Sequence, residues 1–339
     1  MDLTVPLQDL WTASIGQKTR TTYLTGLQCY KLFLVSSRVI PSTHCHTADL
    51  PADEQHLQYF LAHCFKTLKL AFSTVKSYLA GIRYFMLQAG THCALTNHNS
   101  PAFSSIQTLL RGYKKLHHPP SSTRLPITFH VLCKIVGVLR SGLFGHHMDL
   151  VLETMCSMAF FGFLRCGEFT CYKEFNSTIN VGVGDVFVDK EQERYTFRLK
   201  ASKTDPFRKG LDIIIFATNK FVCPFRCMLR LIETRQSSGA HHLDPLFIDQ
   251  RGRPMSRSMF LDCLDIILRR AGYNSNQYSG HSFRIGAATS AAEANIEDHL
   301  IQSLGRWRSN CFTRYIHTPE TTIQQAQLSM CKPASALST

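Results

Sequence analysis

"GHSFRIGAATSAA", residues 280–292, joins a histidine and an arginine three positions apart to a run of small side chains. Residues i and i+3 lie on one face of a helix, so we expect His281 and Arg284 to point toward the same ligand. The small residues that follow would let this helix pack closely against its neighbours. We therefore place the segment inside a folded unit, with His281 and Arg284 at its first turn.

The composition indicates a globular protein with an anionic partner. The chain has 339 residues, enough for two domains, and 44% of them are hydrophobic. It carries 37 Lys and Arg against 24 Asp and Glu, a formal net charge of +13. Such a surplus favours a polyanion, most commonly nucleic acid. A basic enzyme with no such partner is the alternative that charge alone leaves open.

The thirteen cysteines favour a reducing compartment over a disulfide framework. They are odd in number, scattered, and set in apolar runs, as Cys156 and Cys263 are. The chain shows no charged-then-apolar signal segment, so we expect an intracellular protein. No stretch approaches the ~18 uninterrupted apolar residues of a membrane span, and we expect no membrane partner.

The N-terminal part is predicted to be a helical bundle. Apolar side chains recur at helical spacing in residues 18–35, 53–68, 73–90 and 104–117. The stretch "HHPPSSTRLPIT", residues 117–128, contains three prolines and has linker composition. We therefore expect a helical domain over 1–116, a linker over 117–128 and a second domain over 129–339.

The second domain is predicted to be mainly helical with a small sheet. Residues 181–216 alternate apolar and polar side chains and are rich in Val, Ile, Phe and Thr. Turn residues at 189–193 and 205–206 divide this stretch, which indicates a small antiparallel sheet. Helical periodicity precedes it and resumes at Cys223. The expected fold is therefore mainly α with a small antiparallel β-sheet.

Five motifs of the second domain form an ordered set. They are "GFLRCGEF" with Arg165, "KASKTDPFRKG" with Lys203, "GHSFR" with His281 and Arg284, "LGRWRS" with Trp307, and "TRYIHTP" with Tyr315. In this order they resemble the catalytic set of the tyrosine recombinases, the superfamily of phage integrases and bacterial chromosome-dimer resolvases. The resemblance covers roughly the last two thirds of the chain. Its appearance is closest to the eukaryotic Crypton and DIRS-like transposon recombinases.

The resemblance implies a fold and an activity. The N-terminal helices would be the family's core-binding domain, which they resemble in size, helicity and position. The activity would be DNA cleavage and rejoining through a covalent 3′-phosphotyrosine at Tyr315, without cofactor or metal. The partner would be double-stranded DNA, bound by a homo-oligomer that is a dimer on one site and a tetramer in synapsis. In a eukaryote the protein would act in the nucleus, and otherwise in the cytoplasm.

The chemistry of phosphodiester cleavage gives each of these residue types a role. Attack on phosphorus builds charge on the non-bridging oxygens, which Arg165 and Arg284 would grip and stabilise. A tyrosine nucleophile conserves the bond energy in a covalent intermediate. Lys203 would protonate the leaving 5′-oxygen. His281 would take the tyrosine proton or bind a phosphate oxygen. A side chain further on, Trp307, would donate its indole N–H to phosphate or pack beneath the tyrosine segment.

Simpler interpretations exist for single residues. Arg165 would form an ordinary helix-end ion pair with Glu168, which in the family's pattern supports the arginine instead of reacting. Lys200 and Lys209 compete with Lys203 for the acid role, although the "SKT" turn matches the family best at Lys203. His281 would be a core histidine if Arg284 did not follow it.

Two alternative functions and a candidate metal site also follow from the sequence. A type IB topoisomerase uses similar chemistry as a monomer, and a domesticated relative would bind DNA without cutting it. Two cysteines, Cys223 and Cys227, with His241 and His242 could form a zinc site, but their spacing is not that of a common finger. We expect no metal site. The tail after Tyr315 would form one short helix. The resemblance implies that it docks into a neighbouring protomer, and the alternative is that it folds back on its own domain or frays.

Overall fold

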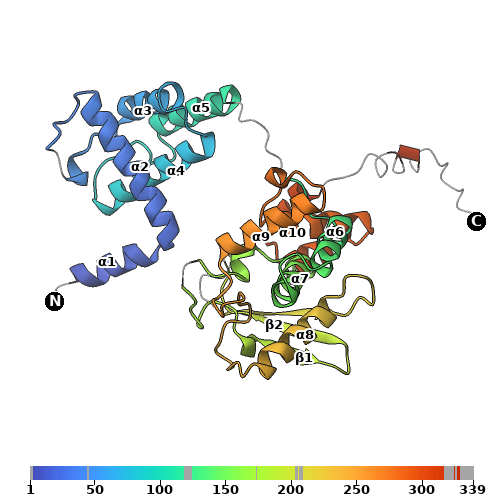
Figure 1. Cartoon of the computed structure of the whole chain (residues 1–339). Coiled ribbons are helices and arrows are strands. Elements are labelled where there is room, and N and C mark those ends of the chain that lie inside the picture. Colours follow the sequence, from blue (N-terminus) through green and yellow to red (C-terminus); the bar gives the residue numbers. More distant parts are fainter. Residues whose placement is uncertain are drawn as a thin grey trace, which may run out of the picture. The chain divides into compact units, whose positions relative to one another are not determined.

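The chain divides into two compact units, residues 1–122 and residues 123–339 (Figure 1). Each unit has a hydrophobic core of its own. The computed structural model describes residues 3–43, 46–117, 124–172, 174–202, 205, 209–316, 324 and 327–328. None of the helices among these residues is long and apolar enough to cross a bilayer. The expectation of a mainly helical protein with a small antiparallel sheet is confirmed.

The first unit is a bundle of helices, and its described α-helices are α1 (Thr4–Ala13), α2 (Gln17–Ser36), α3 (Glu54–Lys66), α4 (Phe72–Gln88) and α5 (Pro101–Leu116). The four predicted helices correspond to α2 to α5. The sequence prediction omits α1, in which no residue is fully buried, although Trp11 packs against the core of the unit. Side-chain caps begin two of the helices: Asp53 accepts the His56 N–H at 3.1 Å, and Ser100 accepts the Phe103 N–H at 3.1 Å.

Helices α2 and α4 cross at close range because each has a glycine at the contact. A Cβ added at Gly26 would lie 2.6 Å from the Tyr78 Cα, and one added at Gly81 would lie 2.6 Å from the Tyr23 carbonyl oxygen. No side chain larger than hydrogen fits at either position. The crossing therefore depends on both glycines.

The second unit contains the described α-helices α6 (Phe129–Arg140), α7 (His146–Phe161), α8 (Pro224–Ser237), α9 (Arg257–Arg270), α10 (Ser282–Glu293) and α11 (Asp298–Gly305). Its sheet has the order β1-β2-β3, with β1 (Val186–Asp189), β2 (Arg194–Leu199) and β3 (Leu211–Phe216) antiparallel to their neighbours. Tyr195, Phe197 and Leu199 alternate along β2 and are buried on one face. Figure 1 shows α8 beside the sheet and α6, α9 and α10 on the side away from it.

Helix α7 is the centre of the second unit, since it is buried along most of its length and packs against α6, α8 and α10. Its C-terminal end at Phe161 leads into the segment that carries Arg165. Arg165 is therefore held close to the end of the most buried helix of the unit.

The small residues of α10 allow the close packing that the sequence predicts. A Cβ added at Gly286 would lie only 1.8 Å from the Ile127 carbonyl oxygen. The Ile127 N–H donates to the Ser282 carbonyl at 2.9 Å, and the Phe129 N–H donates to the Ser290 hydroxyl at 3.0 Å. The segment before α6 thus crosses α10 in direct backbone contact and fixes the helix that begins after His281.

Candidate active site

The turn after α7 carries Arg165 and holds it on a buried carboxylate. Phe163 has φ +48°, in the left-handed region that non-glycine residues rarely adopt. Arg165 then precedes the 3-10 turn η2 (Cys166–Glu168). Glu168 accepts the backbone N–H of Arg165 at 2.9 Å and its Nη1 at 2.8 Å. The ion pair proposed for these two residues is therefore present. It orients the Arg165 guanidinium, while 20% of the Arg165 side chain remains exposed.

A second arginine, Arg306, reaches the same carboxylate. It follows α11 with φ +57°, a conformation that directs its side chain back toward the end of α7. Its Nη1 donates to the Gly162 carbonyl at 2.8 Å, and its Nη2 donates to the Phe163 carbonyl and the Glu168 Oε2, each at 3.2 Å. Burial lowers the pKa of Arg306 and the Glu168 carboxylate opposes that shift. Arg306 therefore ties α11 to the turn that carries Arg165.

Arg284 is the most deeply buried of the three arginines, with 2% of its surface exposed. Its Nη1 donates to the Phe163 carbonyl at 2.7 Å, and its Nη2 donates to the Gly305 carbonyl. The guanidinium carbon lies 4.4 Å from the centre of the Trp307 ring, a cation–π contact. Arg284 thus joins α10 to both segments that carry the other two arginines.

Trp307 lies in the core beneath this cluster. Its ring packs edge-on against Phe163, with centroids 6.0 Å apart, and lies 5.8 Å from Phe312. The Gly305 backbone approaches the indole so closely that a Cβ at this position would overlap the ring. Of the two roles that the sequence leaves open for Trp307, these contacts belong to packing.

His281 lies at the entrance of α10, and its surface is exposed. It precedes the first helical residue, and a Cβ on the neighbouring Gly280 would lie 2.6 Å from the Cys166 Cβ. Since Cys166 follows Arg165 directly, the start of α10 lies against the turn that carries Arg165. The structure therefore brings the segments of His281 and Arg165 together.

The β2–β3 connection begins at the same carboxylate. The Ser202 hydroxyl donates to Glu168 Oε1 at 3.1 Å, and Arg165 Nη1 donates to the Ser202 oxygen at 3.3 Å. Lys203 itself lies outside the described residues, but the residue before it is anchored at the arginine cluster. Lys200 is engaged elsewhere, in an ion pair of 2.5 Å with Asp185.

The backbone of Tyr315 ends the 3-10 helix η5 (Asn310–Tyr315), which packs against α10 and α11. Phe312, three residues earlier, is almost fully buried against Trp307 and anchors this segment. The Tyr315 side chain lies outside the described part of the structure. In the tail, residues 324, 327 and 328 are helical, and the rest of the tail after residue 316 lies outside the described residues.

The cluster as a whole is suited to hold an oxyanion. Arg165 and Arg306 both pair with the single carboxylate of Glu168, and Arg284 joins the same turn through the Phe163 carbonyl, so the local charge is positive. Guanidinium groups held in fixed orientations are well matched to the oxygens of a phosphate. Sequence reasoning missed Arg306, although it stands in the "LGRWRS" motif directly before Trp307. Its left-handed backbone and its bonds to Glu168 and to the Gly162 and Phe163 carbonyls distinguish it from a surface arginine.

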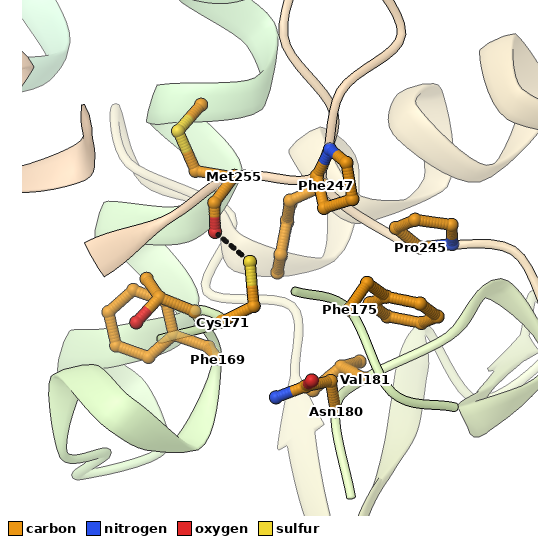
Figure 2. Close-up of a pocket in the computed structure, with 10 residues that line it drawn as sticks. Phe169, Cys171, Phe175, Asn180, Val181, Pro245, Phe247 and Met255 are labelled. Carbon is orange, nitrogen blue, oxygen red and sulfur yellow. Dashed lines mark hydrogen bonds between the residues drawn. The ribbon is translucent and has the colours of Figure 1, made fainter. Parts of the chain in front are cut away.

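A separate small pocket, with an empty volume of about 220 Å³, lies between residues 169–181 and 245–255 (Figure 2). Figure 2 shows Phe169, Phe175 and Phe247 around it, and the Cys171 Sγ donating a hydrogen bond to the Met255 carbonyl. Since no charged residue lines this pocket, it does not suit a phosphate. The described residues also hold no group of three or more His, Cys, Asp or Glu side chains that could bind a metal.

Comparison with known proteins agrees with this geometry. Residues 209–321 match the phage integrase family, while no curated protein sequence matches the chain. The crystal structure of the XerH site-specific recombinase bound to palindromic difH substrate, in a post-cleavage complex, is similar with TM-score 0.62 and 16% identity, over 92% of this chain and 80% of that one. The Tn1549 transposon integrase in complex with transposon right end DNA is similar with TM-score 0.54 and 12% identity, over 91% of this chain and 99% of that one. The chain therefore has the tyrosine recombinase fold.

Proposed function

We propose that this protein cleaves and rejoins DNA strands through a covalent 3′-phosphotyrosine at Tyr315, in site-specific recombination or transposon integration and excision. The observation that carries the proposal is the convergence at Glu168. Arg165 bonds its carboxylate from within the same turn, and Ser202 and Arg306 bond it from two distant segments. Arg284 joins the turn from a third distant segment, through the Phe163 carbonyl. A positively charged cluster assembled in this way is better explained as a site that stabilises the negatively charged transition state of phosphoryl transfer than as part of an ordinary protein surface.

The proposed reaction assigns each side chain one task. The Tyr315 hydroxyl attacks the phosphorus, a P–O bond to the tyrosine forms, and the P–O5′ bond breaks. Arg165 and Arg284 stabilise the charge that develops on the non-bridging oxygens. His281 takes the proton of the tyrosine, and Lys203 donates a proton to the leaving 5′-oxygen. Rejoining is the reverse reaction with a 5′-hydroxyl as nucleophile, so the energy of the phosphodiester is conserved.

The contacts within the cluster support distinct roles for its members. Arg284 already donates to two carbonyls and stacks on Trp307, so its position is fixed before any DNA arrives. Arg165 is held by Glu168 but remains partly exposed, and it is the arginine best placed to follow a bound phosphate. Glu168 and Trp307 act in this scheme through the arginines, as positioning residues.

The partner in this proposal is duplex DNA, gripped mainly through its phosphates. The net charge of +13 supports it, and binding should then weaken steeply as salt is raised. We further propose a dimer on one site and a tetramer in synapsis. We also propose that the chain is related to the Crypton and DIRS-like recombinases and that it acts in the nucleus of a eukaryotic cell.

A nicked suicide duplex tests the chemistry. On this DNA the short strand that is released after cleavage diffuses away, so the covalent protein–DNA adduct accumulates. Wild-type protein should form an adduct that peptide mapping assigns to Tyr315. Tyr315→Phe should bind the duplex as wild type does and form none. An adduct at wild-type yield in this variant, or one mapped to another residue, would refute the assignment.

A further inference from the structure

The hydroxyl of Ser202 bonds both charged groups of the turn that follows α7. It donates to Glu168 Oε1 at 3.1 Å and accepts from Arg165 Nη1 at 3.3 Å. A serine hydroxyl has one proton and two lone pairs, so both bonds can form at once. The Glu168 side chain is only 4% exposed, and hydrogen bonds to a charged group are stronger than those between neutral groups. Ser202 is therefore held at the arginine cluster by two charge-assisted hydrogen bonds.

Glu168 does not need this hydroxyl to satisfy its own oxygens. Without it, Oε1 still accepts from Arg165 Nη1, and Oε2 still accepts from the Arg165 backbone N–H and from Arg306 Nη2. Loss of a hydrogen bond is most costly where a buried group is left without a partner. The Ser202 bonds therefore matter less to the carboxylate than to the β2–β3 connection that they anchor.

The β2–β3 connection is closed by backbone bonds directly after Ser202. The Asp205 N–H donates to the Ser202 carbonyl at 3.0 Å, and Asp205 Oδ2 accepts the Gly210 N–H, next to the start of β3, at 2.9 Å. Position 203 stands between the two bonded residues in the sequence. One peptide unit, about 3.8 Å between Cα atoms, joins it to Ser202. A contact that fixes Ser202 therefore fixes the backbone to which Lys203 is attached.

The other two lysines of this stretch have different surroundings. Lys200 forms an ion pair with Asp185, outside the arginine cluster, and Lys209 is exposed beside β3. Lys203 is the lysine that follows directly on a residue bonded to Glu168. The anchor at Ser202 thus acts on the position to which the proposed mechanism assigns the acid.

We propose that Ser202 is a positioning residue for the general acid, and that its bonds to Glu168 and Arg165 hold Lys203 beside the scissile phosphate. This role rests on the proposed function, in which Lys203 protonates the leaving 5′-oxygen. A lysine ammonium sits on a flexible four-carbon stem, so a fixed backbone limits where its proton is delivered. Misplacement of a reacting group by about 1 Å can cost ~10²-fold in rate. Ser202→Ala should therefore slow cleavage roughly 10- to 100-fold, and no more than removal of Lys203 does.

A change of one atom in the DNA separates this role from a general effect on the site. Two nicked suicide duplexes are compared in single-turnover cleavage, one with oxygen and one with sulfur at the 5′-bridging position of the scissile phosphate. Sulfur leaves without a proton, so cleavage of the sulfur duplex does not need the acid. We expect Ser202→Ala to cleave the oxygen duplex slowly and the sulfur duplex at the wild-type rate. The rate on the sulfur duplex also shows that the variant is folded and that its arginines are in place.

Two further variants make the test specific. Ser237→Ala removes a hydroxyl that bonds the Glu233 carbonyl within α8 at 2.8 Å, and it should cleave both duplexes as wild type does. The double variant Ser202→Ala/Lys203→Ala should be no slower than Lys203→Ala, because the side chain that Ser202 positions is already gone.

Three outcomes would overturn the role of Ser202 alone: equal slowing of Ser202→Ala on both duplexes, additive losses in the double variant, or cleavage of the oxygen duplex by Ser202→Ala at the wild-type rate. A wild-type protein that cleaves neither duplex would instead refute the proposed function, and the role of Ser202 with it.

Discussion

Replacing Gly286 by alanine should destabilise the second unit, although alanine is the better helix former. The added Cβ would lie 1.8 Å from the Ile127 carbonyl oxygen and 2.1 Å from its carbon, whereas real Cβ atoms essentially never approach within 3.0 Å. The segment before α6 must therefore move by more than 1 Å. That movement breaks the 2.9 Å hydrogen bond from the Ile127 N–H to the Ser282 carbonyl, which closes the contact with α10.

The expected size of the effect follows from three terms. Overpacking of a rigid contact costs about 1–3 kcal/mol, and the lost hydrogen bond about 1 kcal/mol. Alanine in place of glycine returns about 1 kcal/mol through helix propensity. The net loss is about 2 kcal/mol, which for a unit of this size lowers Tm by roughly 4–8 °C. Cleavage should fall as well, because α10 carries His281 and Arg284.

Thermal unfolding followed by circular dichroism measures this prediction, with Gly137→Ala as the control. Gly137 also lies within a helix of the second unit, but a Cβ there meets no atom within 4 Å. The control variant should therefore unfold at the same temperature as wild type or a higher one. If Gly286→Ala matches the control, the close approach of α10 to residue 127 is not a constraint and the reasoning is wrong.

The remaining predictions concern the arginine cluster, the acid, the metal and the tail. Glu168→Gln should lower the free energy of unfolding by about 3 kcal/mol, because Arg306 stays buried without its counter-ion, and it should also lower the cleavage rate. An unchanged urea unfolding curve would contradict this prediction. Lys203→Ala should cleave ~10²–10⁴-fold more slowly, and a 5′-bridging phosphorothiolate should restore its rate because sulfur leaves unprotonated; rescue of Lys200→Ala alone would move the acid role. Cleavage in excess EDTA should stay near its normal rate, since guanidinium groups supply the charge stabilisation, and loss that magnesium reverses would oppose this. A chain ending at Thr318 should cut a single site but fail to recombine two, whereas a full-length protein that relaxes plasmids and never recombines two sites would indicate a topoisomerase.

Local pattern was sufficient to predict most of the architecture. Helical spacing located α2 to α5, and alternation located the sheet, because burial on one face imposes a period on the chain. The small residues after Arg284 predicted the close packing of α10, since a helix without bulk can approach another backbone. Helix α1 was not predicted, because none of its residues is fully buried and Trp11 is its one side chain packed against the core of the unit, so no periodic apolar face is present.

Only the tertiary structure decided how the site is assembled. The ordered motifs named Arg165, His281, Arg284 and Trp307, but sequence spacing does not specify which side chains share a partner. The carboxylate of Glu168 is such a partner, and the role of Arg306 follows from it. Arg306 itself has a left-handed backbone conformation after α11, and this conformation turns its side chain inward. Neither composition nor periodicity encodes that direction. The residue types therefore follow from the sequence alone, whereas the hydrogen bonds that join four distant segments exist only once the chain has folded.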